Sequence, residues 1–255
     1  MEEKEERMTI LALFSNKGGV GKTAATVNLA YLAAQSGRST LICDLDPQGS
    51  TTFYFRVKPK LKRKARGLPR QGKPIEHSIK GTDYEGLELL PADFSHRNLD
   101  ITFAGQKRSR RRLAMVLKPL GQEYDLIVLD CPPTINIVAE NILFAADHLL
   151  VPLVPTTLCV RTYEQLLNFV NEQGRAAAML SPFLSMVDGR KKLHRELSAG
   201  LPSQIDGLLA SAIPYRSKVE QMGLYREPLP AFAPNDDASR AYRALWAEIE
   251  KELLR

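Results

Sequence analysis

The sequence has few cysteines and no long hydrophobic run, and each absence argues against a class of protein. No segment of the 255 residues reaches the roughly 18 consecutive apolar residues that a membrane-spanning helix needs. The charged start, Met1 to Arg7, lacks the apolar core of a secretory signal. The three cysteines (Cys43, Cys131 and Cys159) are widely spaced and form no Cys-x-x-Cys pair, so neither a disulfide framework nor a zinc site is predicted. We expect a cytoplasmic protein without membrane insertion.

Acidic residues are also absent from one stretch, residues 56–75, which carries nine lysines and arginines. The whole chain has 35 basic and 29 acidic side chains and a formal net charge of +6, so the remainder of the chain is net acidic. Residues 56–81 lack a hydrophobic period and contain several Pro and Gly residues, which predicts a basic excursion on the surface. Residues 107–112 add a second dense basic run. Such local charge favours a polyanionic partner.

Short apolar runs alternate with stretches of helical character. The expected strands are Met8–Phe14, Thr40–Leu45, Leu87–Leu90, Leu126–Leu129 and Leu149–Leu153, with weaker candidates at Phe183–Val187 and Leu208–Ile213. The expected helices are Thr23–Gln35, Asn98–Leu117, Val138–Ala145, Thr162–Glu172, Lys191–Leu197 and Ala238–Leu253. The alternation predicts an α/β fold, a mostly parallel twisted sheet with helices on both faces, in a single domain over residues 1–255.

The segment from Ser15 to Thr23, Ser-Asn-Lys-Gly-Gly-Val-Gly-Lys-Thr, joins the first predicted strand to the first predicted helix. Its glycines let backbone N–H groups approach phosphates at the start of a helix, where the helix dipole favours negative charge. Lys22 would reach the β- and γ-phosphates, and the Thr23 hydroxyl would ligate Mg²⁺. Asn16 takes the position of the first glycine of the usual motif, and Lys17 is an additional lysine. The segment is therefore a deviant Walker A loop.

Three aspartates follow predicted strands. Asp44 and Asp46 lie in Asp-Leu-Asp-Pro-Gln-Gly at the end of the second strand, and Asp130 ends the strand Leu126–Leu129. Ligands of open parallel sheets bind at the carboxyl ends of the strands, so we expect these carboxylates to face the phosphate loop. Asp130 would hold Mg²⁺ through water, and Asp46 would orient or activate the attacking water.

Taken together, these motifs resemble the ParA family of partitioning ATPases, within the larger deviant-Walker group that includes MinD and the nitrogenase iron proteins. The resemblance covers nearly the whole chain. It rests on Lys17–Thr23, Asp44–Gly49, Leu89–Ala92, Tyr124–Pro133, Met186–Arg190 and Ala212–Pro214. It implies a P-loop NTPase fold, with ATP and Mg²⁺ as cofactors and a slow, Mg²⁺-dependent hydrolysis of ATP to ADP and phosphate.

The resemblance also assigns roles to residues. Lys17 matches the signature lysine that crosses a homodimer interface to the partner's ATP, and Asp46 matches the hydrolysis aspartate. The implied nucleotide-binding set is Lys17, Gly18, Gly19, Val20, Gly21, Lys22, Thr23, Ala24 and Pro214, whose backbone would line the adenine pocket. Ala24 is a departure, since family members often carry a second hydroxyl residue there. Arg190 and Lys218 fall where family members carry DNA-binding basic residues.

These resemblances imply a switch that dimerises around ATP, binds double-stranded DNA non-specifically and associates with the nucleoid. It would segregate or position a DNA or protein cargo, and a ParB-like protein or cargo adaptor would stimulate hydrolysis. A MinD-like membrane-associated regulator is the alternative, and it requires an amphipathic terminal helix with a basic polar face. The polar side of residues 238–253 has mixed charge, which favours a helix docked on the core. A further alternative is a redox ATPase like the nitrogenase iron protein. It would need two suitably placed cysteines in each subunit to hold a bridging cluster.

Overall fold

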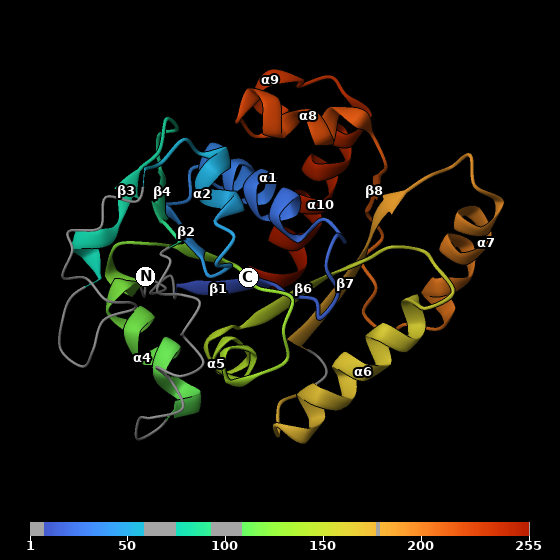
Figure 1. Ribbon diagram of the computed structural model, residues 1–255, viewed down its shortest axis with the longest axis horizontal. Helices are drawn as coiled ribbons and strands as arrows, with labels where there is room; N and C mark the ends of the chain where they lie inside the picture. Colours follow the sequence, from blue (N-terminus) through green and yellow to red (C-terminus); the bar gives the residue numbers. More distant parts are fainter. Residues whose placement is uncertain (1–7, 59–74, 93–108, 177–178, 255) are drawn as a thin grey trace, which may run out of the picture.

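The computed structural model describes residues 8–58, 75–92, 109–176 and 179–254 (Figure 1). Within these residues an eight-stranded sheet has the strand order β3-β4-β2-β5-β1-β6-β7-β8. Every neighbouring pair is parallel except β3 and β4, which are antiparallel. The strands are β1 (Thr9–Leu13), β2 (Thr40–Asp44), β3 (Lys80–Gly81), β4 (Leu87–Leu90), β5 (Leu126–Asp130), β6 (His148–Leu153), β7 (Leu180–Val187) and β8 (Ala212–Pro214).

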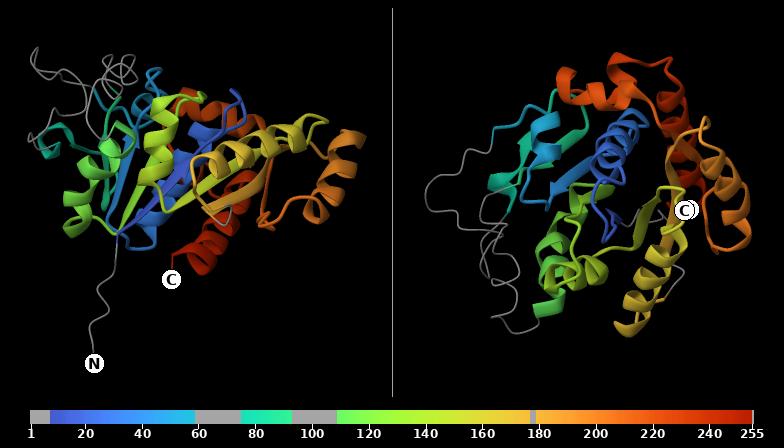
Figure 2. Two further views of the ribbon diagram at one scale, coloured as in Figure 1. Left: turned by 90° about the horizontal axis from the view of Figure 1, so that it is seen from below. Right: turned by 45° about the vertical axis from the view of Figure 1, so that its right-hand side comes forward.

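Helices cover both faces of the sheet, as Figures 1 and 2 show. The α-helices are α1 (Lys22–Gln35), α2 (Ser50–Tyr54), α4 (Arg112–Leu117), α5 (Ile137–Ala145), α6 (Cys159–Glu172), α7 (Lys192–Gly200), α8 (Ser217–Tyr225), α9 (Leu229–Phe232) and α10 (Asp237–Leu253). Short 3-10 helices are η1 (Glu76–Ser78), η3 (Ser109–Arg111), η4 (Lys118–Gln122) and η6 (Leu201–Ser203). Helices α1, α8, α9 and α10 pack on one face, and α4, α5 and α6 pack on the other.

The central strand β1 explains why its sequence is apolar without interruption. Leu11 and Leu13 belong to the core on the side of α1 and α10, whereas Ile10 and Ala12 belong to the core on the side of α5. A parallel strand that is covered on both faces has no solvent side, so alternation with polar residues is absent. The predicted α/β fold, mostly parallel with helices on both faces, is confirmed.

Several boundaries differ from the sequence predictions. The last strand begins at Ala212, so the expected strand Leu208–Ile213 was placed too early. The expected helix Asn98–Leu117 lies partly outside the described residues, and its described part contains η3 and the shorter helix α4. Within the expected basic excursion, residues 59–74 lie outside the described residues, while Ile75 is buried and Lys80–Gly81 pairs with β4.

Three helices were not predicted, namely α2, α8 and α9. Helix α2 has only five residues, three of them serine or threonine, and lacks a hydrophobic period. Helix α8 contains Gly223, and only Met222 among its residues is buried. Short helices of this kind are formed by tertiary contacts more than by their own propensity.

The terminal helix α10 is amphipathic and its apolar side is part of the core. Asp236 caps it by accepting a hydrogen bond from Ala238 N. Tyr242, Leu245 and Trp246 are at most 6% exposed and pack in the core shared with α1. In this arrangement the apolar side is not available to a lipid surface. Among the described residues, no helix combines the length and hydropathy that crossing a membrane requires.

All three cysteines are free and buried. Cys43 and Cys131 are fully inaccessible, and burial raises the pKa of each thiol. Cys159 is 4% exposed, at the start of α6. A cluster held between two subunits needs cysteine ligands at a shared surface, so these positions do not favour the redox alternative.

Candidate functional site

The phosphate loop connects β1 to α1 at the carboxyl end of the sheet. Gly19 and Gly21 adopt positive φ angles of 72° and 92°, a region that side chains with a Cβ atom rarely adopt. A Cβ atom on Gly21 would also lie 2.9 Å from the Ser185 Oγ atom of β7. Gly21 is the N-cap of α1, where no side chain caps the helix and no acidic residue occupies the first turn. The loop thus offers an uncapped helix N-terminus to an anion.

The two lysines of the loop have different surroundings. Lys22 is 7% exposed and its Nζ atom donates to the Lys17 carbonyl oxygen at 3.2 Å. Burial lowers the pKa of Lys22, while the nearby Asp130 carboxylate acts in the opposite direction. Lys17 itself is exposed, and its backbone N–H donates to Ser15 Oγ at 3.2 Å. Lys22 therefore points into the loop, whereas the Lys17 side chain is open to a partner.

Asp44 and Asp130 lie side by side at the ends of β2 and β5, in direct register. Both are buried, at 0% and 1% exposure. Asp44 Oδ2 accepts hydrogen bonds from the Thr52 backbone N–H at 2.8 Å and from Thr52 Oγ1 at 2.7 Å. Asp130 Oδ2 accepts from Thr51 Oγ1 at 2.7 Å. The two carboxylates are thus each held by one threonine of α2.

Burial perturbs both carboxyl groups. It raises the pKa of Asp44 to about 7, and repulsion from Asp130 adds to the increase. Burial likewise raises the pKa of Asp130 to about 6, although hydrogen bonds from the Thr51 and Thr23 hydroxyls oppose the shift. Desolvation disfavours the ionised form, so a nearby cation would be needed to stabilise both charges.

Asp46 lies in the turn that follows β2 and is half-buried. Its Oδ1 atom accepts from Gln48 N at 2.9 Å, and its carbonyl oxygen accepts from Gly49 N at 2.9 Å. The Asp46 charge lies close enough to Lys22 and Asp130 to shift the pKa of each. The structure therefore brings Asp46, Asp44 and Asp130 together beside Lys22, as the sequence predicted.

The donor set around Asp130 fits Mg²⁺. The Thr23 hydroxyl is hydrogen-bonded to Asp130, and the buried Oδ1 atom of Asp44 has no partner. Mg²⁺ prefers oxygen ligands and is usually bound through one or two carboxylates, phosphates and several waters. Among the described residues, no group of three His, Cys, Asp or Glu side chains could hold a metal ion on its own. A Thr23 hydroxyl and a carboxylate acting through water are therefore ligands of the expected kind.

A small pocket borders the Lys17 side of the loop. Its lining includes Asn16 and Lys17 together with Thr156, Cys159 and Tyr163 from the segment that leads into α6 and from α6 itself. The buried Asn16 Oδ1 and Thr156 Oγ1 atoms have no hydrogen-bond partner. Lys17 was predicted as a site residue from its motif, whereas no local motif assigns the α6 residues to the site.

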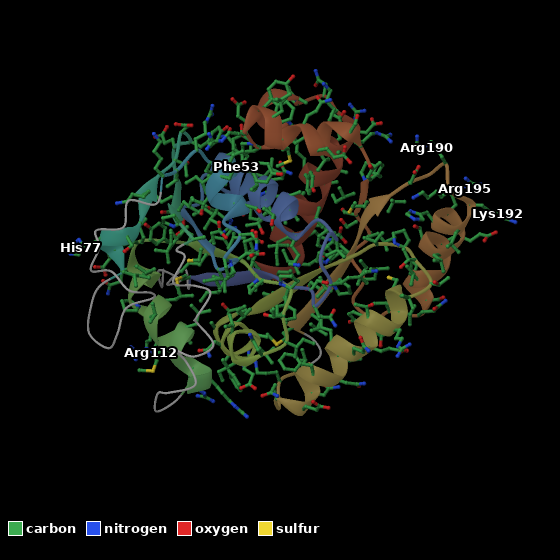
Figure 3. All side chains as sticks on the ribbon, in the orientation of Figure 1. Phe53, His77, Arg112, Arg190, Lys192 and Arg195 are labelled. Atoms are coloured by element: carbon green, nitrogen blue, oxygen red, sulfur yellow. The ribbon has the colours of Figure 1, made fainter. Side chains whose placement is uncertain are left out.

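Arg190 lies at the turn between β7 and α7, and the exposed Lys192 and Arg195 lie nearby at the start of α7 (Figure 3). Its guanidinium is bidentate to Asp188, with both N···O distances 2.9 Å, and holds the pKa of that carboxyl well below its usual range. The turn is further held by His194 Nδ1, which accepts from Asp188 N at 3.1 Å. Arg195 Nη1 donates to the Gly189 carbonyl at 2.7 Å. Arg190 is thus exposed but fixed in direction.

The second expected basic residue, Lys218, lies in the first turn of α8. Its Nζ atom donates to Gln221 Oε1 at 3.1 Å. Pro214 ends β8, four residues earlier in the chain, and Tyr215 N donates to the Val187 carbonyl of β7 at 2.9 Å. The ends of β7 and β8 are therefore adjacent, and both expected basic residues follow them at the carboxyl edge of the sheet.

Two site residues escaped the sequence analysis, Thr51 and Thr52. The available signal was the run Ser50-Thr51-Thr52 directly after Asp-Pro-Gln-Gly. Hydroxyl residues next to a predicted carboxylate cluster are candidate hydrogen-bond donors to it. No motif singled out these two hydroxyls, because serine and threonine are common in turns and at helix starts.

Comparison with known proteins assigns the chain to a family. Residues 8–180 match the model of an AAA domain family. The chromosome-partitioning ATPase Soj of Thermus thermophilus is 31% identical over 247 residues, which cover 94% of each chain. Soj of Bacillus subtilis, a sporulation initiation inhibitor protein, is 26% identical and covers 94% of this chain and 97% of its own.

Solved structures agree with this assignment. Cobyrinic acid a,c-diamide synthase from Mycobacterium smegmatis, with bound ADP and magnesium, has a TM-score of 0.79 at 25% identity and covers 97% of each chain. The McdA–ATP complex of Cyanothece has a TM-score of 0.83 at 21% identity, with 95% and 96% coverage, and shows the shared fold. With the phosphate loop, the three aspartates and these relatives in agreement, the chain belongs to the ParA family of ATPases.

Proposed function

We propose that the chain hydrolyses ATP and uses the ATP-bound state to dimerise, to bind double-stranded DNA without sequence preference, and to position or segregate a DNA or protein cargo. The observation that carries the proposal is the convergence of Lys22, Asp46 and Asp130 at the phosphate loop while Lys17 projects outward. The Thermus relative is named for chromosome partitioning, which supports this class of cargo movement.

In the nucleotide site, the loop N–H groups and the N-terminus of α1 bind the phosphates. Lys22 exchanges its hydrogen bond to the Lys17 carbonyl for the β- and γ-phosphate oxygens. Thr23 and Asp130, the latter through water, hold Mg²⁺, which neutralises phosphate charge when bound. Asp46 orients the water that attacks the γ-phosphate. The ADP- and magnesium-bound mycobacterial relative, 25% identical, supports these two cofactors.

Dimerisation follows from Lys17 in this proposal. Its exposed ammonium extends to the partner's ATP, so two ATP molecules are enclosed between two subunits. A cation that enters another subunit's site stabilises negative charge in the transition state, as an arginine finger does. ATP occupancy thereby controls association of the two copies. A ParB-like protein or cargo adaptor stimulates the slow hydrolysis and separates them.

DNA binding uses the basic residues at the ends of β7 and β8, above all Arg190 and Lys218. Several basic side chains on one face bind duplex DNA non-specifically by neutralising phosphates and releasing counterions. Two copies double the number of phosphate contacts. The bidentate pairing with Asp188 directs Arg190 but offsets part of its charge. We accordingly propose a cytoplasmic, nucleoid-associated homodimer. The shared sheet supports treating residues 1–255 as one domain.

The test is DNA binding by the wild type and by Lys17→Ala with ADP, ATP and a slowly hydrolysed ATP analogue. We expect wild-type affinity to rise with ATP and with the analogue, whereas Lys17→Ala stays at the ADP level because it cannot complete the dimer. Fluorescence anisotropy with a random-sequence duplex measures affinity. Equal affinity with ADP and ATP, or no response to salt, would contradict the proposal.

Substitution of single basic residues tests which surface binds DNA. Arg190→Ala and Lys218→Ala should each weaken ATP-dependent binding and lower the slope of log K against log salt by about one per lost contact. Lys118→Ala is the matched control, because Lys118 is an exposed lysine in η4, before β5, and so at the opposite edge of the sheet. If Lys118→Ala weakened DNA binding as much as Arg190→Ala and Lys218→Ala do, the assignment of DNA binding to the ends of β7 and β8 would be wrong.

A further inference from the structure

Two consecutive threonines of α2 are buried in a helix of only five residues. Thr51 and Thr52 are 0% and 4% exposed. Their hydroxyls donate to carboxylates on different strands: Thr51 Oγ1 to Asp130 Oδ2 on β5 and Thr52 Oγ1 to Asp44 Oδ2 on β2, both at 2.7 Å. Charge-assisted hydrogen bonds of this length are among the stronger ones in proteins. Helix α2 is thus attached to both carboxylates of the nucleotide site.

Thr52 also joins the two ends of the segment from residue 44 to residue 52. Its backbone N–H donates to Asp44 Oδ2 at 2.8 Å, in addition to its hydroxyl. The Thr52 hydroxyl in turn accepts from Ala92 N at 2.9 Å, so its orientation is determined from both sides. Asp44 and Thr52 are therefore bound together at the two ends of the segment that carries Asp46.

We propose that Thr51 and Thr52 are positioning residues of the ATPase site: Thr51 fixes the Asp130 carboxylate, and Thr52 clasps Asp44 and so holds the loop that carries Asp46. The proposal rests on the nucleotide site of the proposed function but not on dimerisation or DNA binding. Neither threonine is assigned a contact with nucleotide or metal. Each acts through an aspartate.

The physical reason lies in the buried carboxylates. The Thr51 hydroxyl donates to Asp130 Oδ2 at 2.7 Å, whereas the Thr26 hydroxyl lies 3.4 Å from Asp130 Oδ1 and the Thr23 hydroxyl is the one expected to turn to Mg²⁺. Removing the Thr51 hydroxyl would leave the buried Asp130 Oδ2 atom without this donor and fix the orientation of the carboxylate less firmly. Residues that orient a metal-binding group through a hydrogen bond typically change metal affinity or activity by about 10–100-fold when mutated.

Thr51 is tested by the Mg²⁺ dependence of nucleotide binding. The affinity of fluorescently labelled ADP is measured with saturating Mg²⁺ and in excess EDTA. We expect Thr51→Val to lower the gain in affinity that Mg²⁺ provides by about tenfold, with the EDTA affinity within twofold of wild type. Thr51→Ser, which keeps the hydroxyl, should retain most of the gain. If Thr51→Val does not fold, Thr51→Ala replaces it with the same expectation.

Thr52 is tested by turnover and by loop protection. Thr52→Val should lower kcat by about tenfold at nearly unchanged KM, because the loop that carries Asp46 loses the hydroxyl bond to Asp44 and keeps only the backbone bond, while ground-state binding is kept. In the nucleotide-free protein, hydrogen exchange at the Gln48 and Gly49 amides should become faster, since both are bonded to Asp46. Thr52→Ser should restore kcat and protection, and it also serves if Thr52→Val does not fold.

Thr40→Val is the matched control. Thr40 is a fully buried threonine at the far end of β2, and its hydroxyl donates to the Arg38 carbonyl at 3.0 Å. It removes a buried hydroxyl from the same strand without touching the site, so the Mg²⁺ gain, kcat and loop protection should stay at wild-type values.

Three results would overturn the positioning roles: an unchanged Mg²⁺ gain in Thr51→Val, an unchanged kcat or loop protection in Thr52→Val, or a serine variant that loses as much as its valine counterpart. Wild-type protein that binds and hydrolyses MgATP without dimerising or binding DNA would overturn the proposed function instead. These failures are distinguishable, because this test measures one nucleotide site and the other measures association.

Discussion

At the scale of single residues, Asp46 should be needed for ATP hydrolysis but not for ATP binding. Its half-buried carboxylate lies near Lys22 and Asp130 and accepts a hydrogen bond from Gln48 N, which lies in its own turn and not in the phosphate loop. We expect Asp46→Ala to bind ATP, to lose at least about 100-fold in turnover and to persist as a dimer. Nucleotide binding, phosphate release and light scattering measure the three properties. A variant that remains monomeric in saturating ATP would contradict the role assigned to Asp46.

A second single residue, Asp44, should make the free energy of unfolding depend on pH. Burial, reinforced by the Asp130 charge, raises the pKa of Asp44 to about 7, so the folded protein retains a proton that the unfolded chain releases near pH 4. The contribution of Asp44 to stability should therefore fall as pH rises from about 4 to 7, by at most about 1.4 kcal/mol per pH unit for this one group, and level off above that range.

Urea unfolding in EDTA without nucleotide, at pH 5 and pH 8, measures this dependence. Asp44→Asn carries no titrating group at this position, so its stability should change less between the two pH values than that of the wild type. The pKa of Asp130 is raised as well, so part of the pH dependence should remain in the variant. A variant that loses as much stability as the wild type over this range would show that Asp44 is not the group responsible.

At the scale of elements, α10 is part of the core. Leu245 is fully buried on the helix side that packs with α1. We expect Leu245→Ala to cost about 2–5 kcal/mol of unfolding free energy, through lost burial and the cavity left behind. Ala244→Ser, an exposed position on the same helix, should change stability by less than about 0.5 kcal/mol. Equal effects of the two variants in urea unfolding would refute this packing.

The buried side of α10 also predicts how the protein behaves toward lipids. An interfacial helix needs an apolar side free to enter the headgroup region. Tyr242, Leu245 and Trp246 are already used in the core. We therefore expect no ATP-dependent sedimentation with anionic liposomes. Sedimentation with ATP but not ADP would instead favour the MinD-like alternative.

At the scale of the whole molecule, dimerisation should be visible in the salt response. Two half-footprints on one duplex double the number of neutralised phosphates, so the slope of log K against log salt should be about twice as steep with ATP as with ADP. Anisotropy titrations between about 50 and 200 mM salt would measure this slope. Equal slopes would mean that ATP does not join two DNA-binding surfaces.

Much of the fold followed from local patterns. The runs around β1, β2, β4, β5 and β6 were found to within a residue or two, because strands buried on both faces are apolar throughout. The starts of β7 and β8 were misplaced. Helices α2, α8 and α9 were missed because contacts distant in sequence stabilise them, such as Leu229 N donating to Asn28 Oδ1 of α1 at 2.8 Å.

The candidate site, too, could be predicted only in part from the sequence. The phosphate loop and the three aspartates are contiguous motifs, so their residues could be named from the sequence. The threonines that hold the carboxylates, the Asp188 pairing of Arg190 and the α6 side of the Lys17 pocket required the coordinates. Hydrogen bonds between strands and helices depend on register, which no local motif encodes.

By itself, the amino-acid sequence determined the class of fold and the chemistry of the phosphate loop. Both depend on residues that are neighbours in the sequence. Glycines permit the positive φ angles of the loop, and apolar runs form the buried strands. Only the tertiary structure decided that Asp44 and Asp130 lie in register, that α2 holds them both, and that α10 is buried in the core. Those features arise from packing and strand pairing, which bring together residues far apart along the chain.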